Sequence, residues 1–514
     1  MRNCGLASIT KSTKLVRAVF LRVPSCPLRF IKAAQPEASN FQQSPFDIIR
    51  TSHLTLLSSN ALGVPGLKRT LSSFFVFILL ATGLVSCGGK STTRTNSGLT
   101  YRIFVSNPLN PTPLGTIFPG LNIVDATKDV LSAFDVDLSG TTTNAGMMVE
   151  SPKRDRTVVF SPTSDVTQSN TLAMVDNAKE TASGSVTLPG PTESMFVWSD
   201  NTTLFAAVPR AAVTGQPAGA VLQIDIVKNS ISATIPIPGA HFLVPNANGS
   251  AILAISDTAN AVTVIAPSLI STGNPLTPVS TSPGLTFDRP VWAVFSPDGS
   301  TAYVMNCGAQ CGGTAASIAV VNMAATPPAV TSVVPVAGAT YGILSGGNLY
   351  VAGTPDSSGT DCQANLCGVL TIFPGADLTA VPATLAITDG YHNHMVLAPH
   401  GQLFIGSRIC TDVLATSSTP ARGCLSVVNT AVNTVYTAPQ NGDVTGIKPI
   451  DGRSVVYVCE NGALQIYDTE LDLGSGHQLQ VQPTRSDGTG QVTITGQAID
   501  VVVADFPNGA VIPN

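Results

Sequence analysis

The stretch "VFSPDGSTAYVMN" at residues 294–306 reads as a short apolar strand, a polar turn and a second apolar strand. Variants of it occur elsewhere in the chain: "VPNANGSAILAIS" at 244–256, "LAPHGQLFIGS" at 397–407 and "KPIDGRSVVYVCE" at 448–460. The aspartate of "SPDG", Asp298, corresponds in these copies to Asn248, His400 and Asp451, each followed by glycine. Glycine tolerates a positive φ, and Asx side chains cap tight turns. Asp298 is therefore predicted to turn the chain and not to act as a catalytic carboxylate.

A second pair of strands follows these hairpins. Two examples are "VLQIDIVKNSISATIPI" at 221–237 and "LSVVNTAVNTVYTA" at 425–438, in which a polar turn joins two apolar segments. Four antiparallel strands in a repeat of about fifty residues form one blade of a β-propeller. Long apolar patterns with helical periodicity are missing after residue 100. The sequence therefore predicts an all-β protein with few helices.

The repeats predict a single propeller over residues 100–510 with eight blades, or with seven if residues 470–497 are an insertion. Each of seven blades has a residue that marks its first strand: Met147, Met195, Phe242, Trp292, Ile343, Met395 and Ile447. The eighth first strand is expected in "AIDVVVADFPNG" at 498–509, because the N-terminal segment "TYRIFVSN" at 100–107 has none of its own. Pairing of the C-terminal strand with the N-terminal blade would close the ring and leave no open sheet edge.

The strings "SPDGSTAYV" (296–304), "SIAVVN" (317–322) and "LSVVNTAVNTV" (425–435) resemble the YVTN family of β-propellers, which is related to the lactonase-type propellers. The resemblance covers almost all of residues 100–510 and implies the fold more than an activity. Repeated Trp-Asp pairs and the double-glycine kelch pattern are missing, and the chain has only 2 Trp. This argues against tryptophan-docked quinoprotein propellers, and no cofactor is predicted.

The segment "KRTLSSFFVFILLATGLVSC" at 68–87 has two basic residues, an apolar run from Leu71 to Val85 and a small residue before Cys87. This order is typical of a secretory signal, and the run is shorter than the roughly 20 residues of a membrane-spanning helix. "LVSC" resembles the bacterial lipobox, which implies a lipid on Cys87; an ordinary signal peptide or a single anchoring helix are the alternatives. The predicted regions are a leader or mis-assigned upstream segment without ordered structure (1–67), a lipoprotein signal peptide (68–86), a flexible linker (87–99) and the propeller (100–510).

The charge balance bears on partners and location. The net charge is −5, and residues 1–86 hold ten Lys/Arg and two acids, so the chain from Cys87 onward has 16 basic and 29 acidic residues and a net charge of −13. This acidic balance argues against nucleic acid as a partner, because phosphate binding needs a basic face. The resemblance to lipoproteins implies an exported protein that is anchored in the bacterial cell envelope through Cys87. Gly88 after the cysteine favours the outer membrane.

Seven cysteines follow Cys87, and six of them form close pairs in sequence. Each pair is expected between the second and third strands of its repeat. Zinc would need four converging ligands, whereas each loop offers two cysteines and no nearby histidine. Because export favours oxidation, we predict no metal, a buried thiol at Cys459 and the disulfides Cys307–Cys311, Cys362–Cys367 and Cys410–Cys424.

Candidate ligand-binding residues precede or begin the first strands, which surround the central channel of a propeller. They are Glu193, His241, Asp288, Arg289, Tyr341, His392, His394, Asp443 and Asp500. His392 and His394 alternate, so a regular strand would place both on the same face. Together with His241 they offer either three nitrogen ligands for a metal or acid/base groups, or they simply hydrogen-bond within a polar channel.

Two functions follow from different classes of protein. The first is a non-catalytic binding or scaffold protein that holds a protein, glycan or small molecule on its axial face. The second, implied by the resemblance, is a lactonase-like hydrolase of a sugar lactone or other cyclic ester. In it Glu193 would activate water, Arg289 would bind a carboxylate, and His241 and His394 would transfer protons. Since no catalytic motif stands out, the sequence favours the binding protein.

Overall fold

The computed structural model describes residues 96–111, 115–164, 169–355, 361–417, 420–470, 491–507 and 510. The chain divides into two compact units, Met1–Gly89 and Lys90–Asn514, and the described residues all belong to the second. The predicted leader (1–67), signal peptide (68–86) and lipidation site Cys87 lie outside the described residues. Within those residues, no helix is long and apolar enough to cross a membrane.

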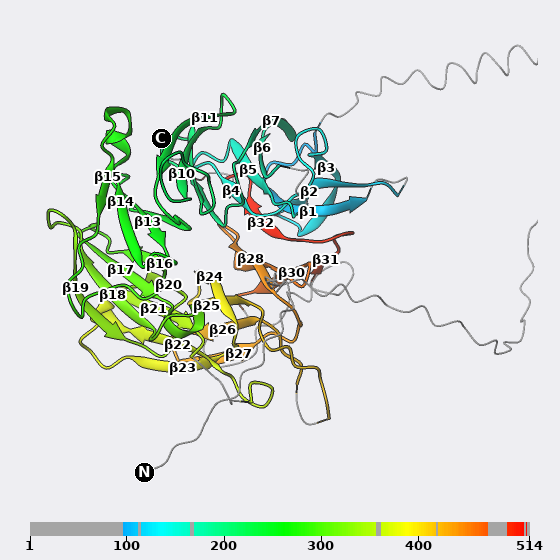
Figure 1. The fold of residues 1–514 in the computed structure, drawn as a ribbon. Helices are drawn as coiled ribbons and strands as arrows, with labels where there is room; N and C mark the ends of the chain where they lie inside the picture. The colour runs from blue at the N-terminus through cyan, green and yellow to red at the C-terminus, as the bar shows by residue number, and fades with distance from the viewer. Residues whose placement is uncertain are drawn as a thin grey trace, which may run out of the picture. The chain divides into compact units, whose positions relative to one another are not determined.

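The described residues form eight four-stranded antiparallel sheets, which are the blades of a β-propeller (Figure 1). The first four blades are β32 (Asp500–Val503), β1 (Arg102–Pro111), β2 (Ile117–Asp125) and β3 (Val130–Asp137); β4 (Met148–Glu150), β5 (Arg156–Ser161), β6 (Thr171–Asp176) and β7 (Thr181–Thr187); β8 (Ser194–Val197), β9 (Thr203–Val208), β10 (Ala220–Asp225) and β11 (Ser230–Pro236); and β12 (Phe242–Pro245), β13 (Ile252–Ser256), β14 (Ala261–Ile265) and β15 (Leu276–Pro278).

The fifth to eighth blades have the same order of strands. They are β16 (Pro290–Phe295), β17 (Thr301–Asn306), β18 (Ser317–Asn322) and β19 (Ala329–Pro335); β20 (Tyr341–Ser345), β21 (Asn348–Gly353), β22 (Gly368–Phe373) and β23 (Ala383–Ile387); β24 (Tyr391–Leu397), β25 (Gln402–Arg408), β26 (Leu425–Asn429) and β27 (Thr434–Thr437); and β28 (Val444–Pro449), β29 (Val455–Glu460), β30 (Ala463–Asp468) and β31 (Gln491–Val492). The helices of the described residues are three short 3-10 helices: η1 (Pro267–Thr272), η2 (Gly308–Cys311) and η3 (Pro374–Ala376).

The C-terminal strand closes the ring as predicted. β32 pairs antiparallel with β1, with Val503 opposite Ile103 and Asp500 opposite Ser106, and the two lie side by side in Figure 1. The first strand of every blade contacts the first strands of both neighbouring blades. Eight hydrophobic clusters fill the eight contacts between neighbouring blades, including the contact of the eighth blade with the first. The prediction of eight blades is confirmed, and the seven-blade alternative is wrong.

The two ends of the blades differ, and they form a pocket face and a hairpin face. The first strands begin at the pocket face, where the loops between second and third strands also lie. The turns between first and second strands, and between third and fourth strands, lie at the hairpin face. The three predicted disulfides, Cys307–Cys311, Cys362–Cys367 and Cys410–Cys424, are formed and belong to the pocket face. Cys459 is a buried free thiol, as predicted.

Asp298 turns the chain at the hairpin face. Its Oδ1 accepts a hydrogen bond from the Ser296 hydroxyl at 2.6 Å and another from the Ser300 backbone N–H at 3.1 Å, while Gly299 has a φ of +71°. These hydrogen bonds from Ser296 and Ser300 lower the pKa of Asp298 to about 2. The side chain is therefore an ionised cap of a hairpin turn, in agreement with the prediction.

Candidate functional site

A pocket of about 480 Å³ lies at the axis of the propeller, on the pocket face. Every blade contributes at least one residue to its wall, through the first strand or the segment just before it. One such residue per blade, in ring order from the first to the eighth, is Asp500, Met147, Glu193, Phe242, Trp292, Tyr341, His394 and Thr445. The volume falls within the range of roughly 300–1,000 Å³ that is usual for small-molecule sites.

Five of the nine predicted site residues line this pocket: Glu193, Tyr341, His394, Asp443 and Asp500. Four are not part of its wall: His241, Asp288, Arg289 and His392. The pocket also has residues that the sequence analysis did not select, among them Asn393 and Arg408.

The expectation that His392 and His394 share one face of a strand is wrong. The pairing of β24 with β25 shifts between these residues, so that His392 lies opposite Ser407 and His394 opposite Gly406. A bulge of this kind adds one residue to a strand and breaks the alternation of its side chains. His392 is consequently fully buried, with its Nε2 2.9 Å from the Thr388 carbonyl, whereas Asn393 and His394 both line the pocket.

Asn393 and His394 bring two unpaired polar atoms to the pocket. Oδ1 of Asn393 and Nε2 of His394 are buried and have no hydrogen-bond partner among the described residues. Burial, together with the charge of Arg408, lowers the pKa of His394 to about 4, so its ring is neutral at physiological pH. The ring also forms a hydrogen bond with the backbone of Thr445, which offers a carbonyl acceptor. A neutral imidazole has one N–H donor, and this bond uses it, so Nε2 is left as the acceptor. The bulge therefore presents two adjacent acceptors to a ligand.

Arg408 is the cation of the pocket wall. It is the last residue of β25 and lies opposite Tyr391 in the sheet, which carries it to the pocket face. Its guanidinium forms no ion pair or hydrogen bond with the described side chains, although its charge acts on Glu193, Tyr391 and His394. A guanidinium is suited to bind a carboxylate or phosphate through two parallel hydrogen bonds. Arg408 is not among the predicted site residues, because those lie at first strands and Arg408 lies at the end of a second strand.

Asp500 is the acidic group of the first blade in the pocket. Its Oδ2 accepts the backbone N–H of Met148 at 2.7 Å, and its Oδ1 accepts that of Val501 at 2.8 Å. Burial nevertheless raises the pKa of Asp500 to about 7, against the opposing effect of these hydrogen bonds and of Lys448. A carboxyl with a pKa near neutrality can both give and take a proton at physiological pH.

His241 is held outside the pocket by two carboxylates. Its Nδ1 lies 3.3 Å from Oδ1 of Asp257, its Nε2 lies 3.6 Å from Oε2 of Glu193, and its ring stacks on Phe242. Burial lowers the pKa of His241, but the two carboxylates outweigh it and raise the pKa to about 9. The hydrogen bond to His241 in turn lowers the pKa of Glu193. Glu193 is thus an ionised partner of a charged imidazole and is poorly suited to activate water.

Asp288 and Arg289 shape a loop instead of the pocket. Oδ2 of Asp288 accepts hydrogen bonds from the backbone N–H groups of Thr314 and Ala315 at 2.8 and 2.9 Å. Arg289 has a φ of +57°, and its backbone N–H donates to the side chain of Asn260. The hydrogen bonds of Asp288 fasten the loop that contains the Cys307–Cys311 disulfide, whereas that of Arg289 reaches the turn between β13 and β14. The proposed role of Arg289 in binding a carboxylate in the channel therefore has no support in the geometry.

The aromatic side of the pocket lies on the fifth and sixth blades. The rings of Trp292 and Tyr341 stack with their centroids 4.4 Å apart and an angle of 22° between their planes. The indole N–H of Trp292 donates to the carbonyl of Gly342 at 3.0 Å, which fixes the ring. A fixed aromatic pair gives a ligand apolar contact area at low entropic cost.

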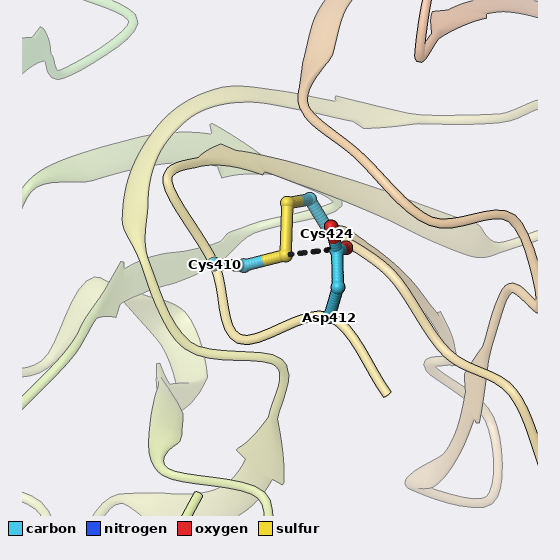
Figure 2. A group of neighbouring side chains, drawn as sticks. All are labelled: Cys410, Asp412 and Cys424. Carbon is cyan, nitrogen blue, oxygen red and sulfur yellow. Dashed lines mark hydrogen bonds between the residues drawn. A yellow bond between two sulfur atoms is a disulfide. The ribbon is translucent and has the colours of Figure 1, made fainter. Parts of the chain in front are cut away.

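The three histidines do not form a metal site. In the part of the chain that the structure describes, one group of three metal-capable side chains has its ligand atoms within 4.8 Å of one another, namely Cys410, Asp412 and Cys424. Figure 2 shows that the two sulfur atoms of this group are bonded to each other, with the Asp412 carboxylate beside Cys410 at 3.8 Å. A disulfide offers no thiolate to a metal. In this oxidised state the group is a stapled loop.

The fold and the site define an eight-bladed β-propeller with an axial pocket, and similar propellers are known among solved structures. Dihydro-heme d1 dehydrogenase NirN, in complex with DHE, is 13% identical over 82% of this chain and 78% of its own, with a TM-score of 0.50. The periplasmic gluconolactonase of Pseudomonas aeruginosa is 14% identical over 79% of this chain and 99% of its own, with a TM-score of 0.43. A putative 6-phosphogluconolactonase from Bacteroides uniformis is 11% identical over the same shares, with a TM-score of 0.43. Such low identities show the fold alone. No protein-family model matches the chain, and no curated protein matches its sequence.

Proposed function

We propose that this protein is an exported, lipid-anchored propeller that binds a small polar molecule in its axial pocket. The observation that carries the proposal is the pair of buried acceptors without partners, Oδ1 of Asn393 and Nε2 of His394. Buried polar atoms usually have a hydrogen-bond partner, and these two lie next to each other in a pocket wall, which supports the binding of a polar ligand at this place. The β-bulge that exposes them is the kind of feature that is often found beside functional sites.

The chemistry of the wall specifies the kind of molecule. The two acceptors require hydrogen-bond donors, such as hydroxyl groups, on the ligand. Arg408, an exposed residue at the pocket wall, can bind an acceptor with negative charge, such as a carboxylate. Trp292 and Tyr341 provide an apolar surface for a ring or a carbon chain. A hydroxylated carboxylic acid of small size meets all three requirements.

The test is a binding screen with the full chain against hydroxy acids and sugar acids, followed by titration calorimetry of the compounds that bind. His394→Ala is expected to weaken binding about tenfold, because a lost hydrogen bond in a dry pocket is worth roughly 1–2 kcal/mol. His400→Ala is the control, since His400 lies in a hairpin turn and contacts Ser454 at 2.9 Å. Equal affinities for the wild type and His394→Ala would refute a role of the bulge in recognition.

Hydrolysis of a cyclic ester is the second candidate function, and Asp500 is the observation that favours it. This carboxyl lines the pocket and has a pKa raised to about 7, which suits a general base near neutral pH. The test is turnover of a lactone panel by the wild type and by Asp500→Asn. A loss of about 100-fold or more in Asp500→Asn is expected for a general base. If the wild type opens no lactone, this second candidate function is rejected.

A further inference from the structure

The hydrogen-bond acceptors of the axial pocket gather on three neighbouring blades. They are Asn393 and His394 on β24 of the seventh blade, Asp443 just before β28 of the eighth, and Asp500 at the start of β32 of the first. β28 contacts both β24 and β32, so it lies between them. These four residues form the acceptor sector of the pocket.

Contacts with β28 hold the acceptor sector together. The ring of His394 forms a hydrogen bond with the backbone of Thr445, the second residue of β28. Asp500 packs against the residue that follows, because a Cβ atom on Gly446 would lie 2.6 Å from Oδ1 of Asp500. His394 and Asp500 therefore contact adjacent residues of one strand, and the glycine leaves the space that the carboxyl of Asp500 occupies.

The acceptor sector can accept more hydrogen bonds than it receives. Each oxygen of the Asp500 carboxyl accepts one backbone N–H, and Oδ1 of Asp443 accepts the backbone N–H of Ile409 at 2.7 Å. Oδ1 of Asn393 and Nε2 of His394 have no partner among the described residues. A carboxylate has about four lone-pair sites, so both aspartates keep room for further donors. A hydroxyl group donates one hydrogen, whereas an ammonium group donates three.

The wall of the axial pocket also has an excess of acidic groups. Among the described residues that line it, three are acidic and one is a permanent cation: Glu193, Asp443 and Asp500 against Arg408. Lys448 acts on Asp500 from outside the wall, but its Nζ pairs with Glu150 at 2.5 Å. A carboxylate that is removed from water is costly without a counter-charge. The acceptor sector therefore favours a ligand group that carries positive charge.

The three blades before the seventh line the pocket with aromatic rings. These are Phe242, Trp292 and Tyr341 on the fourth, fifth and sixth blades. Such rings provide contact area for a carbon skeleton, and their faces attract a cation within about 6 Å. An ammonium group is therefore compatible with the aromatic side of the pocket as well as with the acceptor sector.

We propose that the ligand of the axial pocket carries a protonated amine as well as a carboxylate, and is thus a small amino carboxylic acid. This inference rests on the proposed function and narrows its ligand class. The ammonium group lies in the acceptor sector, where it gives hydrogen bonds to Asn393 and His394 and a counter-charge to Asp500. The carboxylate faces Arg408, and the carbon skeleton lies against Trp292 and Tyr341.

The test compares acids that differ only by an amine in place of a hydroxyl group, in titration calorimetry with the full chain at neutral pH. The pairs are serine and glycerate, γ-aminobutyrate and γ-hydroxybutyrate, and glucosaminate and gluconate. In a pair that binds, we expect the amine to bind about tenfold more tightly, because a charge-assisted hydrogen bond is about twice as strong as a neutral one. The N-acetyl derivative of the amine, which has no charge at nitrogen, should lose this preference.

Two variants locate the amine in the acceptor sector. Asp500→Asn and Asp443→Asn each remove one negative charge, and each should lower the preference for the amine several-fold. The preference is a ratio of two affinities of one protein, so a structural disturbance that weakens both ligands alike leaves it unchanged. Asp443→Asn covers the case in which Asp500→Asn fails to fold. Glu470→Gln, at an exposed carboxyl outside the pocket, is the control and should keep the preference of the wild type.

The outcomes separate this inference from the proposed function. Equal affinities for the two members of each pair, an N-acetyl derivative that binds as tightly as the amine, or a preference that persists in both aspartate variants would each overturn the inference. The proposed function would stand in all three cases, because a ligand would still bind. If neither the amines nor the hydroxy acids bind, the proposed function fails and the inference fails with it.

Discussion

Glu460, the last residue of β29, is a fully buried carboxyl. Its Oε2 accepts the Tyr467 hydroxyl at 3.3 Å, while Oε1 has no partner among the described residues. Burial raises the pKa of Glu460 to about 8, and the charge of Asp412 acts in the same direction. The folded protein therefore holds a proton on Glu460 at pH values where the unfolded chain, with an ordinary pKa of about 4.3, has lost it. Stability must fall as the pH rises between these two values.

Glu460→Gln should remove this pH dependence, because the amide has nearly the shape of the protonated carboxyl and cannot ionise. We expect the variant to be more stable than the wild type at about pH 8, by about 2 kcal/mol or more, and similar to it near pH 4. Urea unfolding at several pH values measures the difference. Glu470→Gln, at an exposed carboxyl, is the control. A wild type and a Glu460→Gln variant with parallel pH profiles would show that Glu460 titrates normally.

At the scale of strands and loops, the parts that could be predicted are those encoded in short sequence patterns. Gly299 turns the hairpin because it accepts a positive φ, and the same glycine recurs in other blades. The bulge in β24 was not predictable, because the two alternating histidines of "YHNHMVL" at 391–397 are compatible with a regular strand and the extra residue shows only in the pairing with β25. Arg408 was missed for a related reason: its place beside Tyr391 follows from strand pairing and not from its neighbours in sequence.

The three disulfides differ in the length of the loop that each closes, and this predicts their relative contributions to stability. Cys410 and Cys424 are 14 residues apart, whereas Cys307 and Cys311 are 4 apart. Loop closure in the unfolded chain costs more entropy for a longer loop, which gives about 3 kcal/mol for the first and about 2 kcal/mol for the second. Double Cys→Ala replacement should therefore lower the free energy of unfolding more at Cys410–Cys424. Denaturant unfolding of the two double variants measures this, and the reverse order would show that native-state contacts of the loops outweigh chain entropy.

In the molecule as a whole, the ring is closed in the first blade, where the last strand of the propeller, β32, pairs with β1. Arg102, at the start of β1, forms ion pairs with Glu180 of the second blade at 2.8 Å and with Asp505 after β32 at 2.6 Å. Its side chain is 7% exposed and that of Glu180 is 3% exposed. The pattern of the repeats predicted that β32 would pair with β1, because the N-terminal blade lacked a first strand. This ion-pair cluster could not be predicted, because it joins residues about 80 and 400 positions apart along the chain.

Arg102→Met should therefore weaken the closure of the ring at the first blade. The change leaves Glu180 buried without its counter-charge, and removal of one partner of a buried pair costs about 3–5 kcal/mol. Lys228→Met is the matched control: it breaks the Lys228–Asp225 pair, in which the lysine side chain is 78% exposed, and should cost less than about 1 kcal/mol.

Urea unfolding gives both free energies, and hydrogen exchange of β32 shows where the structure loosens. We expect the amides of β32 to exchange faster in Arg102→Met while those of β16 to β19, on the fifth blade, stay protected, because the variant loses the ion pair that fastens Asp505, just after β32, to the start of β1. If the two variants lose equal stability, strand pairing and the apolar contact of the first and eighth blades hold the ring closed without help from Arg102.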